Sequence, residues 1–180
     1  MCNGVVEEKE KAVYEYGFSI VFYNLINLGT MLLLSWLMGC IWESAIYAVC
    51  YIILRKFAGG YHAKGPITCY LVSTAMFFIS IFLATHINID FCYILIIIVL
   101  ALFGSRIVPV DTENKSLSEK EKKVYRYIVI FVFSFEMLLC LVLFHFGLYV
   151  WCNSIVLAII CCEILVIIGY LYNKIRKEDC

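Results

Sequence analysis

The chain has 180 residues, of which 64% are hydrophobic and only 16% are charged, and its formal net charge is zero. Its mean hydropathy of +0.93 excludes an ordinary soluble domain, and the balanced charge gives no reason to expect a nucleic-acid partner. We therefore expect an all-α polytopic membrane protein that forms a single membrane-embedded domain over residues 1–180.

The N-terminal segment, residues 1–16, carries consecutive charges from Glu7 to Lys11. Charges at this place exclude the apolar core of a secretion signal. The apolar residues around them predict a short amphipathic helix at the membrane interface. Two roles remain open for it, because the helix could help to hold a substrate or could be a frayed cytoplasmic tail.

Apolar stretches of bilayer-spanning length follow this segment. We predict about six transmembrane helices, of which the second and fourth are short, at residues 17–36, 38–54, 67–86, 89–104, 127–147 and 150–172. All 14 Lys and Arg residues lie in the N-terminal segment, the 55–66 loop, the 105–126 loop or the C-terminal tail. By the positive-inside rule, both termini and both basic loops face the cytoplasm.

The stretch from Arg55 to Cys69 is the candidate catalytic loop and helix start, because it places His62 seven residues before Cys69. An imidazole that accepts the proton of a nearby thiol makes a competent nucleophile at neutral pH. On one continuous helix the two residues would lie about 10.5 Å apart along the axis. A direct pair therefore requires a break in the helix between them.

The sequence supplies this break at Gly65-Pro66, which disfavours helix before the proline and suits Pro66 to the first turn of a new helix. Cys69 would then lie in the first turn, where the helix dipole and unpaired N–H groups favour a thiolate. Lys64 adds positive potential, and Gly59 and Gly60 allow positive φ or close backbone approach.

Two other interpretations of this stretch compete with the catalytic one. It could be a basic connecting loop followed by a cysteine that only fills space in the next helix. A zinc site built on His62 and Cys69 would need further ligands, and the spacing matches no common zinc pattern. We therefore expect no metal and no cofactor.

The residues Arg55, Gly60, His62, Ala63 and Cys69 together resemble the signature of the accessory gene regulator protein B (AgrB) family. A second stretch, P-V-D-T-E-N-K-S-L-S at residues 109–118, is similar to the family's later polar loop. It departs from that pattern at Val110 and Ser116, which often are alanine and proline in the family. Neither departure touches the chemistry.

The resemblance implies a membrane-embedded cysteine endopeptidase in which His62 is the general base and Cys69 is the nucleophile. Its substrate would be a small autoinducer precursor of the AgrD type, which is cleaved and cyclised to a thiolactone or lactone at the cytoplasmic face of a bacterial cell membrane. Membrane lipids and a second copy of the chain are further expected partners. The residues expected to support the pair or bind substrate are Arg55, Gly59, Gly60, Lys64, Asp111, Asn114 and Lys115.

Polar residues inside the predicted spans admit two roles. Each could be a third catalytic group that orients the imidazole or an interhelical hydrogen-bond partner, and the set comprises Glu43, Glu136, Glu163, Asn24, Asn27 and Asn153. His86 and His145 lie towards the outer ends of their spans. The cysteines other than Cys69 show no paired framework, and we expect most to act as small hydrophobic residues.

The 105–126 loop ends in a charged run in which Ser118 and Glu121 have the spacing of a capping box. This predicts a basic helix that leads into the fifth span. The loop could be only a charge cluster that sets orientation, or its P-V-D-T-E-N-K part could pack beside the 55–69 loop and grip the substrate. The rival function for the whole chain is a non-catalytic transporter component or scaffold.

Overall fold

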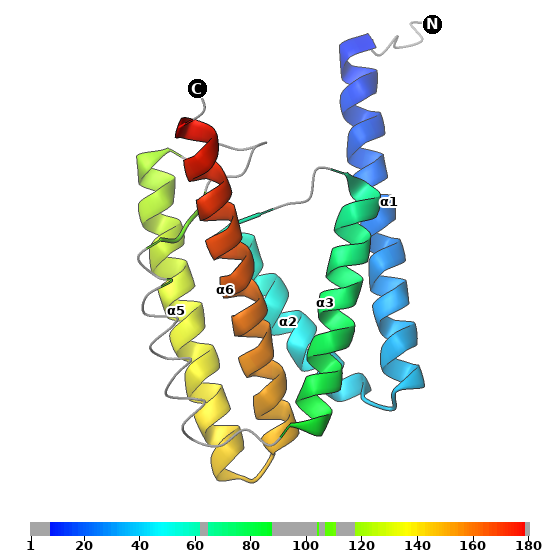
Figure 1. The fold of residues 1–180 in the computed structure, drawn as a ribbon, viewed down its shortest axis with the longest axis vertical. Coiled ribbons are helices and arrows are strands. Elements are labelled where there is room, and N and C mark those ends of the chain that lie inside the picture. The colour runs from blue at the N-terminus through cyan, green and yellow to red at the C-terminus, as the bar shows by residue number, and fades with distance from the viewer. Residues whose placement is uncertain (1–7, 62–64, 88–103, 105–106, 111–117, 179–180) are drawn as a thin grey trace, which may run out of the picture.

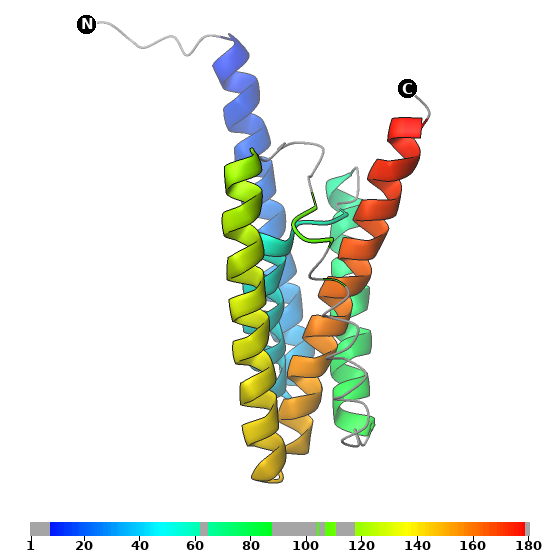
Figure 2. The ribbon, with the colours of Figure 1, turned by 90° about the vertical axis from the view of Figure 1, so that its left-hand side faces the viewer.

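The computed structural model describes residues 8–61, 65–87, 104, 107–110 and 118–178. Its regular elements are the helices α1 (Glu8–Leu37), α2 (Ile41–Ala58), α3 (Pro66–His86), α5 (Glu119–His145) and α6 (Tyr149–Glu178). Helices α1 and α3 lie side by side, α5 and α6 form a second pair, and α2 runs between the pairs (Figures 1 and 2). The predicted all-α class is confirmed for the part of the chain that the structure describes.

Four of the described helical segments are long and apolar enough to cross a membrane: Gly17–Leu37, Pro66–His86, Glu119–His145 and Tyr149–Arg176. They correspond to the first, third, fifth and sixth predicted spans. Large apolar side chains on α1, α3 and α5 are exposed, among them Leu25, Trp36, Leu71 and Phe131. An apolar outer surface on long helices is what lipid contact requires, and the chain is therefore a membrane protein.

The segment predicted as the second span is helical, as α2 at Ile41–Ala58 instead of 38–54, but it is not among the four candidate spans. Its 18 residues include Glu43, Arg55 and Lys56, so it is less apolar than the four candidate spans. The fourth predicted span, 89–104, lies almost wholly outside the described residues.

Helix α6 is the central helix of the bundle. It contacts α2, α3 and α5. In its most apolar 18-residue stretch, 56% of the residues are buried, whereas the share is 22% or less in the other three candidate spans. Side chains from Cys152 to Val166 on its inner face form the middle of the core. A segment that packs against α6 is therefore fixed to the best-packed part of the molecule.

Tight turns and helix directions bring the functional segments to one end of the bundle. The α1–α2 and α5–α6 connections each end in a glycine turn, with Cys40 N–H bonded to Ser35 O and Leu148 N–H bonded to Leu143 O. The end of α2 and the starts of α3 and α5 therefore lie towards the same end as both chain termini (Figure 1). The structure confirms the prediction from the sequence that these segments share one end. That this end faces the cytoplasm stays a prediction.

No break in the helix marks the predicted boundary at residue 16, although the first candidate span begins at Gly17. A single 30-residue helix runs from Glu8 to Leu37, so the charged residues from position 8 onward continue directly into the first apolar segment. Such a helix is about 45 Å long, which exceeds the thickness of a bilayer's hydrocarbon core. Charges alone do not end a helix, because the backbone hydrogen bonds continue through them.

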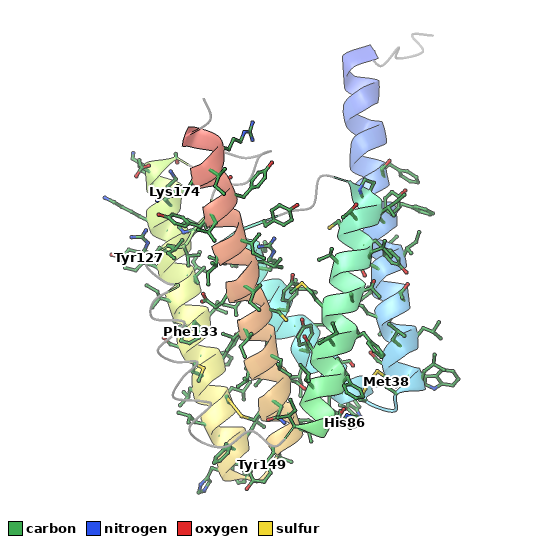
Figure 3. All side chains as sticks on the ribbon, in the orientation of Figure 1. Met38, His86, Tyr127, Phe133, Tyr149 and Lys174 are labelled. Atoms are coloured by element: carbon green, nitrogen blue, oxygen red, sulfur yellow. A yellow bond between two sulfur atoms is a disulfide. The ribbon has the colours of Figure 1, made fainter. Side chains whose placement is uncertain are left out.

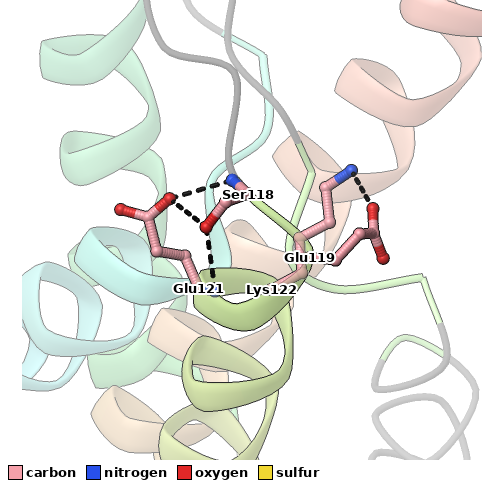
Figure 4. Close-up of polar contacts among 4 residues, drawn as sticks. All are labelled: Ser118, Glu119, Glu121 and Lys122. Carbon is pink, nitrogen blue, oxygen red and sulfur yellow. Dashed lines mark hydrogen bonds and ion pairs between the residues drawn. The ribbon is translucent and has the colours of Figure 1, made fainter.

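The predicted capping box at the start of α5 is confirmed (Figure 4). Glu121 N–H donates to Ser118 Oγ over 3.3 Å, and Ser118 N–H donates to Glu121 Oε2 over 2.8 Å. Lys122 forms an ion pair with Glu119 one turn further on, with 3.2 Å between Nζ and Oε1. These contacts fix the first turn of α5 beside the segment that precedes it.

Candidate active site

The loop that follows α2 is held by Arg55, which lies in the last turn of that helix. Its guanidinium donates hydrogen bonds to the carbonyl oxygens of Gly59 and Tyr61. A helix leaves its last carbonyls without intrahelical donors, and the planar guanidinium can serve two acceptors at once. The path of the chain over residues 59–61 is thereby fixed by a side chain one turn back.

Val110, at the start of the second polar segment, lies directly against this loop. Val110 N–H donates to Ala58 O over 3.0 Å, and Gly59 and Val110 form an isolated parallel bridge. A Cβ on Gly59 would lie 2.2 Å from Val110 O, so no side chain fits there. Arg126 on α5 holds the same segment by donating from Nε to Val108 O over 2.9 Å.

Cys69 lies in the first turn of α3, as the sequence predicts. Gly65 caps the helix with extended backbone, Pro66 begins it, and Cys69 N–H makes an early helical bond to Gly65 O at 3.0 Å. The Cys69 thiol is free, and the residue is exposed. The thiol is therefore open to a reagent or substrate at the N-terminal end of α3.

His62 and Lys64 lie outside the described residues, as do Asp111, Asn114 and Lys115. The structure therefore describes Tyr61, the residue before His62, and Gly65, the residue after Lys64. It brings Arg55, Gly59 and Gly60 together in one hydrogen-bonded loop. The pairing of His62 with Cys69 stays a prediction.

Tyr51 on α2 is a residue near the site that the sequence does not single out. Its ring stacks on Tyr47 with 5.8 Å between centroids, one turn before Arg55 on α2. Its phenol lies within electrostatic range of both Arg55 and Cys69. Tyr51 therefore has one electrostatic neighbour at the end of α2 and another at the start of α3.

Half of the six polar residues singled out in the spans are interhelical hydrogen-bond partners. Asn27 on α1 donates to Ser73 on α3 over 2.9 Å, and Asn153 on α6 donates to Ala84 O and Ile87 O over 2.9 and 2.7 Å. Glu43 accepts from Trp151 Nε1 over 3.3 Å. These contacts join helices, which is one of the two roles expected of these side chains.

The other two carboxylates lie deeper in the bundle. Glu136 is buried, and its Oε2 has no partner among the described residues. Glu163 lies against Gly104, where a Cβ would come within 1.9 Å of its Oε2. Asn24, on α1, is exposed.

The two other histidines lie at the far end of the bundle from Cys69. His86 is the last residue of α3, about 25 Å along the helix axis from Cys69, and His145 is the last residue of α5. Figure 3 places His86 near Met38 and Tyr149, at the end opposite to Lys174. Neither histidine can act on the Cys69 thiol in this arrangement.

The expectation that the remaining cysteines are unpaired is wrong for two of them. Cys140 on α5 and Cys152 on α6 form a disulfide beside the turn that joins these helices. Both lie in apolar stretches, where the sequence predicts that a cysteine packs as a small hydrophobic residue. Within the described residues, no three His, Cys, Asp or Glu side chains gather closely enough to hold a metal ion.

Comparison with known proteins identifies the family. The model of the family described as accessory gene regulator B matches residues 2–168, nearly the whole chain. The chain belongs to the AgrB family. The family resemblance carried by Arg55, Gly60, His62 and Cys69 is thereby confirmed, although the match does not assign a role to any single residue.

Curated proteins of this AgrB type show the same relationship. The chain is 35% identical over 104 residues to a protein described as AgrB-like from Clostridium acetobutylicum, covering 56% of this chain and 49% of that protein. It is 32% identical over 110 residues to protein FsrB of Enterococcus faecalis, covering 56% of this chain and 46% of that protein. The chain thus spans about half the length of these curated relatives. No solved structure matches it.

Proposed function

We propose that this protein is a cysteine endopeptidase that matures a small autoinducer precursor peptide at the cytoplasmic face of a bacterial membrane. Membership of the AgrB family supports the biological role. The observation that carries the chemistry is the free, exposed Cys69 thiol in the first turn of α3, preceded in the chain by a loop that is clamped as far as Tyr61, the residue before His62. His62 and Cys69 are the proposed catalytic pair.

The first step is acyl transfer to the enzyme. His62 takes the thiol proton, and the Cys69 thiolate attacks a peptide carbonyl near the C-terminal side of the precursor. Collapse of the tetrahedral intermediate breaks the C–N bond, and the imidazolium gives its proton to the departing amine. The C-terminal fragment leaves, and the rest of the precursor is held as a thioester on Cys69.

The second step resolves the thioester. A cysteine thiol or serine hydroxyl of the precursor attacks the thioester carbonyl, and Cys69 leaves as a thiolate that recovers a proton. The product is a thiolactone or lactone ring. A site that excludes bulk water favours this closure over hydrolysis, and the apolar surroundings of the bundle suit that requirement.

The supporting residues have separate roles in this proposal. Arg55, Gly59 and Gly60 shape the loop that bears His62, and Lys64 adds positive charge beside the thiolate. Asp111, Asn114 and Lys115 follow Val110, which lies against Gly59, so they are suited to binding the precursor's charged groups. A precursor of the AgrD type with an amphipathic leader would lie on the same membrane surface, and a second copy of the chain is the proposed oligomeric partner.

The test is incubation of the protein in lipid nanodiscs with a candidate precursor, followed by mass spectrometry of peptides and protein. We expect wild type to release a C-terminal fragment and to carry a transient adduct on Cys69. Cys69→Ala should do neither, while Cys180→Ala, which also removes one thiol, should match wild type. Cleavage by Cys69→Ala at the wild-type rate would show that Cys69 is not the nucleophile, whereas no cleavage by the wild type itself would favour the non-catalytic membrane role.

Product mass separates two outcomes of the second step. A cyclic product is lighter than the hydrolysed one by the mass of one water molecule. Hydrolysed product alone, under conditions in which the acyl-enzyme forms, would reduce the proposal to plain intramembrane proteolysis.

A further inference from the structure

One face of α6 forms a seat for the loop that leads to His62. Three residues make this seat: Leu165, Gly169 and Tyr172. Their spacing of four and then three residues places them on the same side of the helix. Each contacts the loop through a different kind of interaction, and none belongs to the motif that identifies the family by sequence.

The first contact is a hydrogen bond from the loop to the helix backbone. Tyr61 N–H donates to Leu165 O over 2.9 Å. The carbonyl of Tyr61 accepts from the Arg55 guanidinium on the other side. Both backbone polar groups of Tyr61, the residue before His62, are therefore occupied.

The second contact is close backbone packing at Gly169. A Cβ at this position would lie 2.4 Å from Tyr61 N, 2.7 Å from Gly60 C and 2.8 Å from Gly60 Cα. Gly60 has the same property from the opposite side, because its own Cβ would lie 2.7 Å from Leu165 O. Two glycines thus allow the loop backbone and the helix backbone to approach to a distance that side chains would forbid.

The third contact joins two aromatic side chains. The Tyr61 and Tyr172 rings meet edge to face, with 5.8 Å between centroids and an interplanar angle of 72°. This geometry is the favoured one for aromatic pairs. Tyr61 is consequently held at its N–H, its carbonyl and its ring.

We propose that Gly169 and Tyr172 are positioning residues for the catalytic base, because they seat the loop that ends at His62 on the central helix. This inference rests on the proposed function, since it assigns His62 a catalytic role. The seat lies at the end of the family match, which stops at residue 168.

The expected effect of Gly169→Ala follows from the geometry. To reach ordinary van der Waals separation of about 3.5 Å, the loop must move by about 1 Å from the new methyl group. A displacement of about 1 Å in a catalytic group can reduce the rate about 100-fold. We expect kcat to fall by that order while KM changes little, because the loop shift misplaces the base and leaves the precursor's binding groups in place.

Two further variants guard against a simple folding defect. Tyr172→Ala removes a contact without introducing a clash and should reduce kcat about two- to tenfold, while Tyr172→Phe keeps the ring contact and should retain more activity than Tyr172→Ala. Gly29→Ala on α1 is the matched control, because nothing lies within 4 Å of the added methyl group. It should leave kcat, KM and thermal stability unchanged.

The decisive readout is the pH dependence of Cys69 alkylation by iodoacetamide, measured in a variant in which Cys69 is the only exposed thiol. An imidazole-paired thiol reacts below pH 8, whereas an isolated thiol reacts with an apparent pKa near about 8.5. Gly169→Ala should lose the low-pH reactivity and so resemble His62→Ala. Lost cleavage with an unchanged alkylation profile would overturn the proposal, because the defect would then be structural.

Limited trypsin digestion tests the seat without reference to catalysis. Cleavage after Lys64 in the folded protein should be at least about tenfold faster in Gly169→Ala than in wild type or Gly29→Ala. Equal digestion rates would refute the seat itself. If wild type neither cleaves a precursor nor shows low-pH reactivity at Cys69, the proposed function fails and the positioning role fails with it, whatever the digestion rates.

Discussion

Replacement of Arg55 by lysine tests the clamp on the loop most directly. The guanidinium donates to two carbonyl oxygens, those of Gly59 and Tyr61. Lysine keeps the charge but offers a single ammonium, so at least one of the two hydrogen bonds is lost. A hydrogen bond from a charged donor contributes about 1.5–3 kcal/mol, and the partial exposure of Arg55 favours the lower value.

A loss of about 1.5 kcal/mol lowers the equilibrium constant for the seated loop about tenfold. We therefore expect kcat/KM for precursor cleavage to fall about tenfold or more in Arg55→Lys, with a larger fall in Arg55→Ala. Cleavage rates in nanodiscs at several precursor concentrations give this ratio. The control is Lys56→Arg, a change of the neighbouring exposed cation, which should cleave as wild type does.

The digestion rate after Lys64 must rise in parallel with the loss of activity if the clamp acts through the loop. Wild-type activity in Arg55→Lys would refute this reasoning. A large loss of activity without any rise in digestion would place Arg55 in direct contact with the precursor, which is a different role.

Two further predictions concern stability. Asn27→Leu removes interhelical hydrogen bonds to two hydroxyl groups on α3. Each contributes about 0.6 kcal/mol, so the free energy of unfolding in detergent should fall by about 1 kcal/mol. Asn24→Leu, at an exposed position, should leave it unchanged. Ser118→Ala removes the side-chain oxygen that caps α5 and should cost about 1 kcal/mol, seen as faster amide hydrogen exchange in the first turn of α5; Ser118→Asp should restore protection, and unchanged exchange in the alanine variant would contradict the capping role.

The helix starts are the part of the fold that the sequence predicts best. Pro66 after Gly65 and the pair Ser118 and Glu121 each satisfy a local requirement of a helix N-terminus, and the structure begins helices at those residues. Such signals depend on a few neighbouring backbone groups and need no knowledge of tertiary contacts. For the same reason, the position of Cys69 in a first turn could be predicted.

Contacts between distant segments could not be predicted in the same way. Gly169 lies in an apolar helix, where a glycine reads as a weak helix residue, and only the loop opposite it reveals its use. Cys140 and Cys152 likewise read as packing residues until the α5–α6 turn brings them together. Each of these roles belongs to a pair of segments, so a pattern within one segment carries no signal of it.

The position of Arg55 shows how one residue can serve both fold and site. The end of α2 leaves carbonyl groups that need donors, and the chain beyond it must leave the helix in one direction only. Arg55 supplies donors to Gly59 and Tyr61, while the helix α6 supplies an acceptor to Tyr61. The hydrogen bonds made by its own backbone groups therefore hold the loop in place. Activity could thus depend on this arginine without any contact between the arginine and the precursor. Arg55 fixes the backbone of Gly59 and Tyr61, which lie just before His62 in the chain.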